Sequence, residues 1–266
     1  MDINDNPLEK FRGRFDNLGI KVGVSSYVWP AGYSDNVRRL KGIVGEVQLL
    51  AYEPMEKSPV SDAEIAILGE LKTGGISYSL HLPVPTGMAL PGGTPEAAVA
   101  GVISRFKPLG IASYVLHVEK NGGTFDTRLA AERIARILQT TGVEPKTMCV
   151  ENLIGTPFNE VWDSVEDLGV SLCFDIGHLL CEGGDPLSFM EMYGKHMRMA
   201  HIHGVAERDH RPLWHIPPEL FGNIIKKLAG LKLEGAMIIE NFSLEDIAQS
   251  LECLARYDAT STGRAQ

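Results

Sequence analysis

The sequence predicts an α/β protein with one domain, folded as a (β/α)8 TIM barrel. Short apolar segments alternate with helical patterns from residue 19 to residue 257, which is the order of a parallel sheet covered by helices. A chain of 266 residues with 44% hydrophobic residues can bury one large core. An open, doubly wound sheet is the alternative. It normally has a glycine-rich turn after its first strand, and here that turn is Ser25-Ser-Tyr-Val-Trp-Pro30.

Eight strands are expected, each a run of five or six residues rich in aliphatic side chains. They are Lys21–Ser25, Glu46–Leu50, Ser77–Leu82, Tyr114–Val118, Thr147–Glu151, Val170–Asp175, Met199–His203 and Ala236–Glu240. Parallel strands need long crossover connections, and a series of eight βα units in one domain of this length closes most simply into a barrel.

The helices expected between the strands have recognisable start signals. Ser61-Asp-Ala-Glu64 is a capping box, and Thr94-Pro95-Glu96 places a capping hydroxyl before a first-turn proline. Further starts are expected at Asp126 or Thr127, at Asp185-Pro186, at Pro217-Pro218-Glu219 and at Ser243. Each of these helices follows a predicted strand, as a βα repeat requires.

The barrel is expected to span residues 19–257, with a polar N-terminal extension at 1–18 and a mobile C-terminal tail at 258–266. The sequence shows no run of eighteen apolar residues and no leader pattern, so no membrane partner is expected. The four cysteines lack close-spaced pairs, which predicts reduced thiols and a cytoplasmic protein. Cys149 and Cys173 each precede a strand-terminal acid by two residues, and we interpret them as small buried hydrophobes.

The charge of the chain bears on its partners. The formal net charge is −9. Proteins that bind nucleic acid need basic surface to replace counterions, so no nucleic-acid partner is expected. A small-molecule substrate is expected instead, and a negatively charged one would need local cations. The sequence leaves open whether the chain is a monomer or a homo-oligomer.

The strand ends carry the candidate functional residues, because the active site of a (β/α)8 barrel lies at the carboxyl ends of its strands. Taken in order, these ends present His81, His117, Glu151, Asp175, His201 with His203, and Glu240, and the loops add His178, Asp209 and His210. His201 and His203 are two residues apart, so both side chains leave the same face of the strand. Clustered carboxylates in a water-poor mouth repel one another, and bound cations remove that cost.

The segment Ser171-Leu-Cys-Phe-Asp-Ile-Gly-His178 illustrates the pattern. An apolar strand stops at Asp175, and Gly177 is expected to allow a tight turn that brings His178 back beside Asp175. A carboxylate and an imidazole at the mouth of a sheet form half of a metal site. Taken alone, the segment fits a simple helix cap as well. The recurrence of metal-capable side chains at six strand ends favours the metal site.

The candidate ligands also indicate which metal is bound. Imidazole and carboxylate without thiolate suit zinc, manganese or iron better than calcium or magnesium. The nine candidates are His81, His117, Glu151, Asp175, His178, His201, Asp209, His210 and Glu240. They exceed what one ion can use, so two or three divalent ions are expected. Such a site holds the attacking and leaving oxygens of a phosphoryl displacement and generates hydroxide near neutral pH.

On these residues the chain resembles the xylose isomerase-like TIM barrel superfamily, which joins sugar isomerases and epimerases to endonuclease IV-type enzymes. The resemblance runs from about Gly19 to Tyr257. The superfamily's Glu, Asp, His, Glu metal quartet would be Glu151, Asp175, His201 and Glu240. The endonuclease branch binds three ions, which implies His81, His117, His178 and the pair Asp209-His210 as further ligands. In this chain Asp209 and His210 are adjacent, whereas the branch has one residue between them.

The chain is most similar in appearance to the cobamide-remodelling phosphodiesterases of this superfamily, which cleave the phosphoester in the nucleotide loop of B12-like cofactors. The segments that carry this similarity are Ser25–Tyr27, Glu46–Leu50, Tyr78–Pro83, Glu151–Leu153, Phe174–Leu180, His201–Val205 and Arg208–Leu213. The similarity implies a metal-dependent phosphodiesterase with a small phosphoester substrate, such as a cobamide, and Glu151 as a bridging ligand. Gln48 stands where many relatives have an acid, and we assign it no role.

A metal-dependent sugar or sugar phosphate isomerase or epimerase is the alternative. It would use one ion at the quartet, with Glu151 and Glu240 as the catalytic acid and base beside a carbonyl. That chemistry leaves His117, His178 and His210 without a function. Substrate contacts are expected from His203, from Lys120 and Arg211 as rim cations, and from Tyr27 and Trp29 as stacking surfaces.

Overall fold

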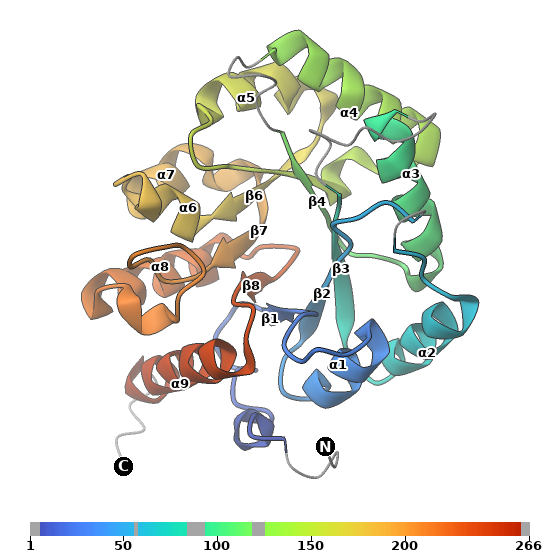
Figure 1. Ribbon diagram of the computed structural model, residues 1–266. Helices are drawn as coiled ribbons and strands as arrows, with labels where there is room; N and C mark the ends of the chain where they lie inside the picture. Colours follow the sequence, from blue (N-terminus) through green and yellow to red (C-terminus); the bar gives the residue numbers. More distant parts are fainter. Residues whose placement is uncertain (1–5, 56–57, 84–93, 119–125, 262–266) are drawn as a thin grey trace.

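The computed structural model describes residues 6–55, 58–83, 94–118 and 126–261, with side chains described up to residue 257. Within these residues, eight parallel strands form a closed barrel in the order β1-β2-β3-β4-β5-β6-β7-β8, as predicted. β8 pairs with β1, with Met237 opposite Val22 and Ile239 opposite Val24, and this pairing closes the sheet. Figure 1 shows the strands at the centre and the helices as an outer ring.

The observed strands agree closely with the predicted ones. They are β1 (Val22–Ser25), β2 (Glu46–Leu50), β3 (Ser77–His81), β4 (Tyr114–His117), β5 (Met148–Glu151), β6 (Ser171–Asp175), β7 (Met197–Ile202) and β8 (Met237–Ile239). His117 lies opposite Glu151, and Asp175 lies opposite His201. The register therefore brings the strand ends to one level of the barrel.

The helices alternate with the strands, and the predicted starts are confirmed. They are α1 (Tyr33–Leu40), α2 (Asp62–Lys72), α3 (Pro95–Phe106), α4 (Thr127–Thr141), α5 (Phe158–Val165), α6 (Ile176–Cys181), α7 (Pro186–Tyr193), α8 (Pro218–Leu231) and α9 (Leu244–Ser261). Short 3-10 helices are η1 (Glu9–Phe11), η2 (Lys107–Leu109), η3 (Pro145–Thr147), η4 (Glu166–Leu168), η5 (Gly194–His196) and η6 (Leu213–His215). The side chains of Ser61, Thr94, Asp126 and Asp185 accept backbone N–H groups of the first turns of α2, α3, α4 and α7.

Three helices, α1, α5 and α6, were not marked by a recognised start signal. The first turn of α1 has no cap of its own, and Glu64 of α2 instead accepts the backbone N–H of Ser34 at 2.6 Å. α5 follows Pro157 without a side-chain cap. α6 begins directly at the end of β6, with Asp175 as its N-cap. In α1 the partner of the helix end is distant in sequence, so a local pattern does not show it.

The N-terminal segment packs against the barrel. The buried side chains in it are Leu8, Phe11, Phe15 and Leu18, all members of the main core cluster. Lys10 Nζ contacts Glu252 of α9 at 3.0 Å, and Asn6 Nδ2 donates to the carbonyl oxygen of Arg39 at 2.8 Å. The segment therefore lies between α9 and α1 (Figure 1). At the other end, α9 continues to Ser261, past the predicted start of the tail, and residues 262–266 lie outside the described residues.

The barrel interior forms a core of its own beneath the candidate site. Its apolar members are Val115, Cys149, Cys173, Met199, Ala236 and Ile238. Glu151 and His201 stand two residues beyond Cys149 and Met199, so they continue the same inward faces one layer higher. The interpretation of Cys149 and Cys173 as buried hydrophobes is confirmed, because both are free and fully buried.

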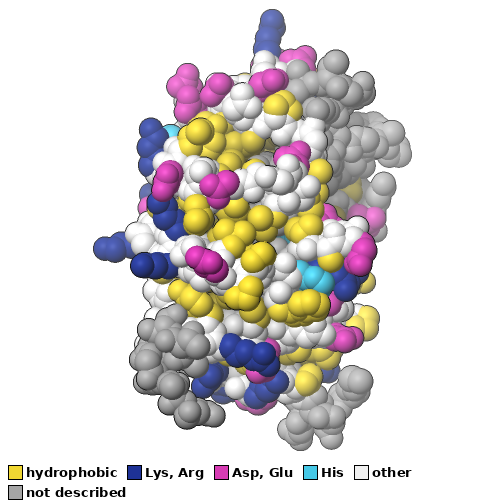
Figure 2. Space-filling view, turned by 90° about the vertical axis from the view of Figure 1, so that its left-hand side faces the viewer, with side chains coloured by type: hydrophobic (Ala, Val, Ile, Leu, Met, Phe, Trp, Pro, Cys, Tyr) yellow, Lys and Arg dark blue, Asp and Glu magenta, His cyan; other side chains and the backbone are white. Residues whose placement is uncertain are grey.

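The outer surface carries both charged and hydrophobic side chains. On the side where α6, α7 and α8 lie, basic and acidic side chains surround patches of hydrophobic ones (Figure 2). This face therefore mixes both signs of charge. Among the described residues, no helix combines the length and the apolar character that crossing a membrane takes.

Candidate metal centre

The predicted strand-end residues lie together at the carboxyl end of the barrel. His81, His117, Glu151 and Asp175 are the last residues of β3, β4, β5 and β6, His201 lies in β7, and Glu240 directly follows β8. His117 is half-buried and the other five are buried. Closure of the sheet thus gathers side chains from six separate parts of the chain.

Glu151, Asp175, His201 and Glu240 form the predicted quartet. One ligand atom of each lies within 4.8 Å of the ligand atoms of the others. His201 Nδ1 lies 3.0 Å from Glu240 Oε2 and 3.2 Å from Glu151 Oε1. Asp175 Oδ2 lies 3.8 Å from the same nitrogen. Three carboxylates and one imidazole therefore converge in a region closed to solvent.

Glu151 also belongs to a second group, with His81 and His117. His117 Nε2 lies 3.1 Å and His81 Nε2 lies 3.4 Å from Oε2 of Glu151. The other oxygen of Glu151, Oε1, faces His201 in the quartet. Glu151 would therefore be able to contact an ion in either group.

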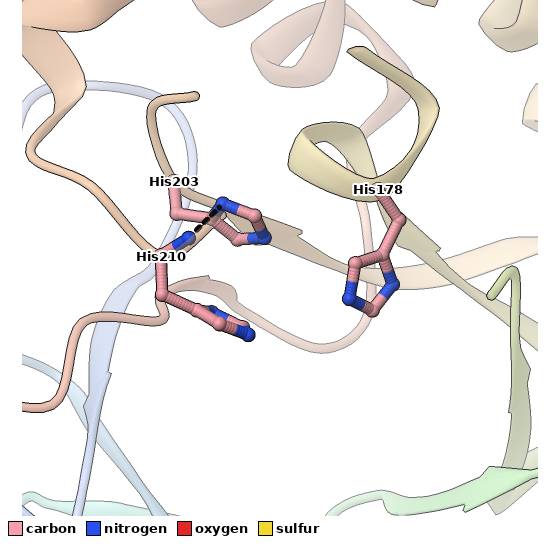
Figure 3. A group of neighbouring side chains, drawn as sticks. All are labelled: His178, His203 and His210. Atoms are coloured by element: carbon pink, nitrogen blue, oxygen red, sulfur yellow. Dashed lines mark hydrogen bonds between the residues drawn. The ribbon is translucent and has the colours of Figure 1, made fainter. Parts of the chain in front are cut away.

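A third group consists of His178, His203 and His210, whose rings point toward one another (Figure 3). His178 comes from α6, His203 follows β7, and His210 comes from the next loop. The backbone N–H of His210 donates to Nδ1 of His203 at 2.9 Å. His178 Nδ1 lies 3.6 Å from Asp175 Oδ2, so this group adjoins the quartet.

Backbone carbonyl groups orient several of the imidazole rings. In His81, His178 and His210, Nδ1 lies 3.2, 3.0 and 3.0 Å from a backbone carbonyl oxygen. A ring that donates through Nδ1 keeps the lone pair of Nε2 free for an ion. His201 is reversed. Its Nδ1 faces the carboxylates, and its Nε2 lies 2.8 Å from Nε2 of the buried Gln48 in β2.

An asparagine follows each glutamate of the quartet and fixes the neighbouring loop. Asn152 donates to the carbonyl oxygen of Asp175 and accepts from its N–H, both at 2.8 Å. Asn241 donates to the carbonyl oxygens of His210 and Arg211 at 2.9 and 3.0 Å. Neither asparagine was predicted as a site residue from the sequence. The signal that could have found them is the Glu-Asn pair that recurs at the ends of β5 and β8.

Burial and neighbouring histidines act in opposite directions on the carboxylates. Burial alone would raise the pKa of Glu151, but His201 and His117 hold it well below its usual value. The same balance lowers the pKa of Glu240, mainly through His201, and lowers the pKa of Asp175 through the histidines beside it. The carboxylates are therefore ionised inside the barrel.

Two buried carboxylate oxygens of the quartet, Oδ2 of Asp175 and Oε2 of Glu240, accept no hydrogen bond within the described part of the chain, although histidine nitrogens lie 3.6 and 3.0 Å from them. Leaving an anionic oxygen buried without a hydrogen bond is costly, and native proteins satisfy nearly all such groups. A cation at the quartet would satisfy both oxygens. The nitrogen and oxygen donors suit zinc, manganese or iron. The residues of the quartet therefore fit a divalent metal ion.

Cys173 lies beside the quartet but differs from its members. Its Sγ is within 4.8 Å of ligand atoms of Glu151 and His201. Burial raises the pKa of this thiol to about 12, and the thiolate is the form that binds metals. Cys173 therefore stays an uncharged thiol at the edge of the site.

The other predicted site residues are placed differently. Lys120 lies outside the described residues. Tyr27 is 57% exposed, whereas Trp29 is 7% exposed with the Arg39 guanidinium over its ring, which leaves too little ring surface for a planar ligand. Arg211 is half-buried. Asp209 joins none of the three donor groups among the described residues, although it is adjacent to His210.

Gly177 has a different function from the predicted one. It lies in α6 and has no positive φ, so the expected glycine turn is wrong, because the chain passes directly from β6 into a helix. A Cβ at this position would lie 2.0 Å from Cε1 of the His203 ring, so Gly177 makes room for that ring. His178 is placed by the helix, and its backbone N–H donates to Oδ1 of Asp175 at 2.7 Å.

Several solved structures share this fold. Endonuclease IV from Thermus thermophilus superimposes with a TM-score of 0.72 and 19% identity, over 91% of this chain and 99% of that one. D-psicose 3-epimerase from Clostridium cellulolyticum superimposes with a TM-score of 0.63 and 16% identity, over 92% of this chain and 98% of that one. 3-Keto-D-glucoside 4-epimerase from E. coli superimposes with a TM-score of 0.68 and 10% identity, over 90% of this chain and 98% of that one. At these identities the similarity shows the fold alone.

Comparison with curated proteins gives no match. The profile of the xylose isomerase-like TIM barrel family matches residues 45–257. This range covers β2 to β8 and every member of the three donor groups. The chain belongs to the xylose isomerase-like TIM barrel family.

Proposed function

We propose that this protein is a metal-dependent phosphodiesterase that hydrolyses a small-molecule phosphoester. The observation that carries the proposal is the excess of donors over the quartet. Glu151 is shared by two groups, and a third group of imidazoles adjoins them. A centre with one ion would leave His81, His117 and His210 without a function. Two or more closely spaced ions are typical of enzymes that displace a group at phosphorus.

The three groups would hold the ions as follows. The quartet would hold one divalent ion, zinc, manganese or iron, and Glu151 with His81 and His117 would hold a second. The three histidines of Figure 3 are candidates for a third. When bound, such ions supply Lewis-acid chemistry, because they neutralise charge on phosphoryl oxygens and lower the pKa of water.

Tyr52 adds a proton donor to the centre. It lies on the loop after β2, with its hydroxyl 3.3 Å from Oε1 of Glu240 and its ring edge against His81. Burial and the charge of Glu240 both raise the pKa of this phenol, so it keeps its proton. Tyr52 can therefore donate a hydrogen bond to a substrate oxygen, and Glu240 beside it can hold a proton transferred during the reaction.

A cobamide is the substrate that we propose, cleaved at the phosphoester of its nucleotide loop. The support is the similarity of several segments to cobamide-remodelling phosphodiesterases. Two of them, Glu151–Leu153 and Phe174–Leu180, supply Glu151, Asp175 and His178. The net charge of −9 makes a nucleic-acid substrate unfavourable.

A sugar isomerase or epimerase is the second candidate. Glu151 and Glu240 both approach Nδ1 of His201, at 3.2 and 3.0 Å, so the two carboxylates lie close together beside one nitrogen. Proton transfer beside a carbonyl uses such a pair as acid and base. Two of the structures that share the fold are epimerases by name.

A metal count and a substrate panel on the same preparation test the proposal. Metal-loaded protein is incubated with cobamides, with simple phosphodiesters and with aldoses and ketoses. We expect two or three ions per chain, hydrolysis of the phosphoesters and unchanged sugars. Epimerised sugars with intact phosphoesters would overturn the proposal.

A substitution at the shared carboxylate tests the centre directly. Glu151→Gln is expected to lose bound metal and turnover while its circular dichroism spectrum stays unchanged, because the barrel core lies beneath this layer. Glu160→Gln, the same change at an exposed site in α5, is the matched control. Full metal content and turnover in Glu151→Gln would exclude this residue from the centre.

A further inference from the structure

A cavity of about 540 Å³ opens beside the candidate metal centre, between the loops that follow β1, β2 and β8. Its aromatic and large apolar wall residues include Tyr27, Tyr33, Tyr52, Met55 and Phe242. Two of these touch the centre. The Tyr52 hydroxyl lies 3.3 Å from Glu240 Oε1, and the ring of Phe242 lies 4.6 Å from that of His210. Tyr52 and Phe242 therefore join the wall of the cavity to the centre, and none of the described lining residues belongs to the three donor groups.

The described lining is unfavourable for a second phosphate. No lysine, arginine or histidine is among the described residues that line the cavity, and Glu53 contributes a carboxylate. Phosphate oxygens bind where cations or several free N–H groups face them, and a carboxylate repels them. The charged part of a phosphoester therefore belongs at the metal centre, and an uncharged part of the same molecule fits the cavity.

The walls offer ring surface and two free polar groups. Tyr27 and Tyr52 are 57% and 38% exposed, so part of each ring is open to a molecule in the cavity. Within the described residues, the Tyr27 hydroxyl and the Glu53 carboxylate have no hydrogen-bond or ion-pair partner. The Tyr33 hydroxyl, by contrast, donates to the carbonyl oxygen of Leu50 at 2.6 Å. Tyr27 and Glu53 are thus available to a ligand.

We propose that this cavity, the base pocket, binds a flat, uncharged nitrogen heterocycle together with its sugar. The base pocket is defined by Tyr27, Tyr52, Glu53 and Phe242. The proposal rests on the proposed function, because the phosphate on the sugar has to lie at the metal centre. Aromatic walls stack on a flat ring, and the carboxylate accepts a hydrogen bond from a sugar hydroxyl.

The size of the base pocket also indicates which end of a large substrate lies inside it. A volume of about 540 Å³ lies within the range of pockets that hold drug-sized ligands. A nucleoside fits this space, whereas a corrin macrocycle with its side chains does not. If the substrate is a cobamide, its nucleoside end lies in the base pocket and its macrocycle lies outside. The enzyme then recognises the base and tolerates changes beyond the phosphate.

Binding of a nucleoside without phosphate tests the base pocket apart from catalysis. Calorimetry with benzimidazole riboside and metal-free protein measures it. Tyr27→Ala is expected to weaken binding about 5- to 100-fold, the range that loss of one stacking ring gives. Tyr27→Phe, which keeps the ring, should bind within a few-fold of the original protein. Trp214→Ala is the control, because Trp214 is 56% exposed and does not line the cavity.

Turnover of two esters separates this inference from the proposed function. The pair is the methyl phosphodiester of benzimidazole riboside and that of methyl riboside, which lacks the base. We expect a kcat/KM about 10- to 100-fold higher for the ester with the base, and a smaller ratio in Tyr27→Ala. Hydrolysis of both esters with equal kcat/KM would overturn the base pocket and support the phosphodiesterase. Riboside binding that depends on Tyr27, without hydrolysis of any phosphodiester, would support the pocket and overturn the function.

Discussion

Gln48 and His201 meet inside the barrel, with their Nε2 atoms 2.8 Å apart and both side chains fully buried. The Oε1 atom of the same amide has no hydrogen-bond partner among the described residues. A half-turn of the amide places this oxygen against Nε2 of His201, which then carries the ring proton and leaves the Nδ1 lone pair to face the carboxylates. Gln48 is thus placed to set the tautomer that an ion at the quartet requires.

Substitution of Gln48 should change metal affinity before it changes folding. Gln48→Leu is expected to weaken zinc or manganese binding about 10- to 100-fold, because His201 loses the partner that orients it. Gln48→Glu should bind nearly as well as the original protein, since a carboxylate accepts the same N–H. Competition with a chelator measures the affinities, and thermal unfolding of the metal-free proteins is the control. Equal affinity in all three proteins would remove Gln48 from the centre.

His210 and Asp209 can be tested separately because their geometry differs. His210 has a φ of 53°, a left-handed conformation that asparagine tolerates better than most residues. His210→Asn should therefore keep the loop while it removes the imidazole. We expect about one ion fewer per chain and most of the hydrolysis lost. Asp209→Asn should keep both the full number of ions and the hydrolysis. Metal analysis and a phosphoester assay on one preparation decide, and unchanged values in His210→Asn would show that the third group holds no ion.

Addition of a methyl group at two helical glycines should have opposite effects. Gly177→Ala forces a Cβ into the His203 ring and is expected to lower the free energy of unfolding by about 1–3 kcal/mol. Gly101→Ala in α3 meets no atom within 4 Å and should raise it by about 0.5–1 kcal/mol. Urea unfolding of the metal-free proteins measures both. A Gly177→Ala protein as stable as the original would mean that His203 moves aside freely.

The stability of the metal-free protein should fall as the pH rises from 6.5 to 9. Burial by itself lowers the pKa of His203, but the charge of Asp175 and its hydrogen bond outweigh burial and raise this pKa to about 9. The stabilisation from such a group is complete below its unfolded pKa, about 6.5, and is lost as the pH rises through 9. The loss from His203 is roughly 3 kcal/mol at most. Bound metal should abolish it, because the ligand form of imidazole is unprotonated.

The control for this pH dependence is His203→Asn. The pKa values of His117 and His201 are raised as well, so the original protein loses stability from several groups. The difference between the two urea-unfolding curves, both in chelator, isolates the part that belongs to His203. Parallel curves from pH 6.5 to 9 would contradict the linkage between His203 and Asp175.

The barrel was predictable because its signals are local. A short apolar run that stops at Asp175 marks both a strand and the position of a candidate ligand at its end. The capping side chain of Ser61 announces α2 within four residues. By contrast, the start of α1 is held by Glu64, thirty residues further along, and no local pattern records it.

The fine geometry of the centre was less predictable, because it depends on contacts between distant strands. The sequence places His201 at a strand end, but which ring nitrogen faces the carboxylates depends on Gln48, 153 residues earlier. Asp209 and His210 were predicted as a pair, yet the backbone at His210 has a positive φ and this residue joins the third group without Asp209. His203 was predicted as a substrate contact, and the structure places it beside His210 in the third group.

The close approach of His203 to the backbone at Gly177 has a consequence for other proteins with this fold. A protein of the same fold with any side chain at the position of Gly177 has no room for an imidazole at the position of His203 in this orientation. The two positions should therefore vary together, with glycine as the permissive partner. Asp-x-Gly-His in one strand–helix junction, together with His-x-His in the next strand, forms a signature that can be searched for directly. It would sort members of the family into those able to assemble three neighbouring imidazoles and those limited to the four-ligand core, before any of their structures is known.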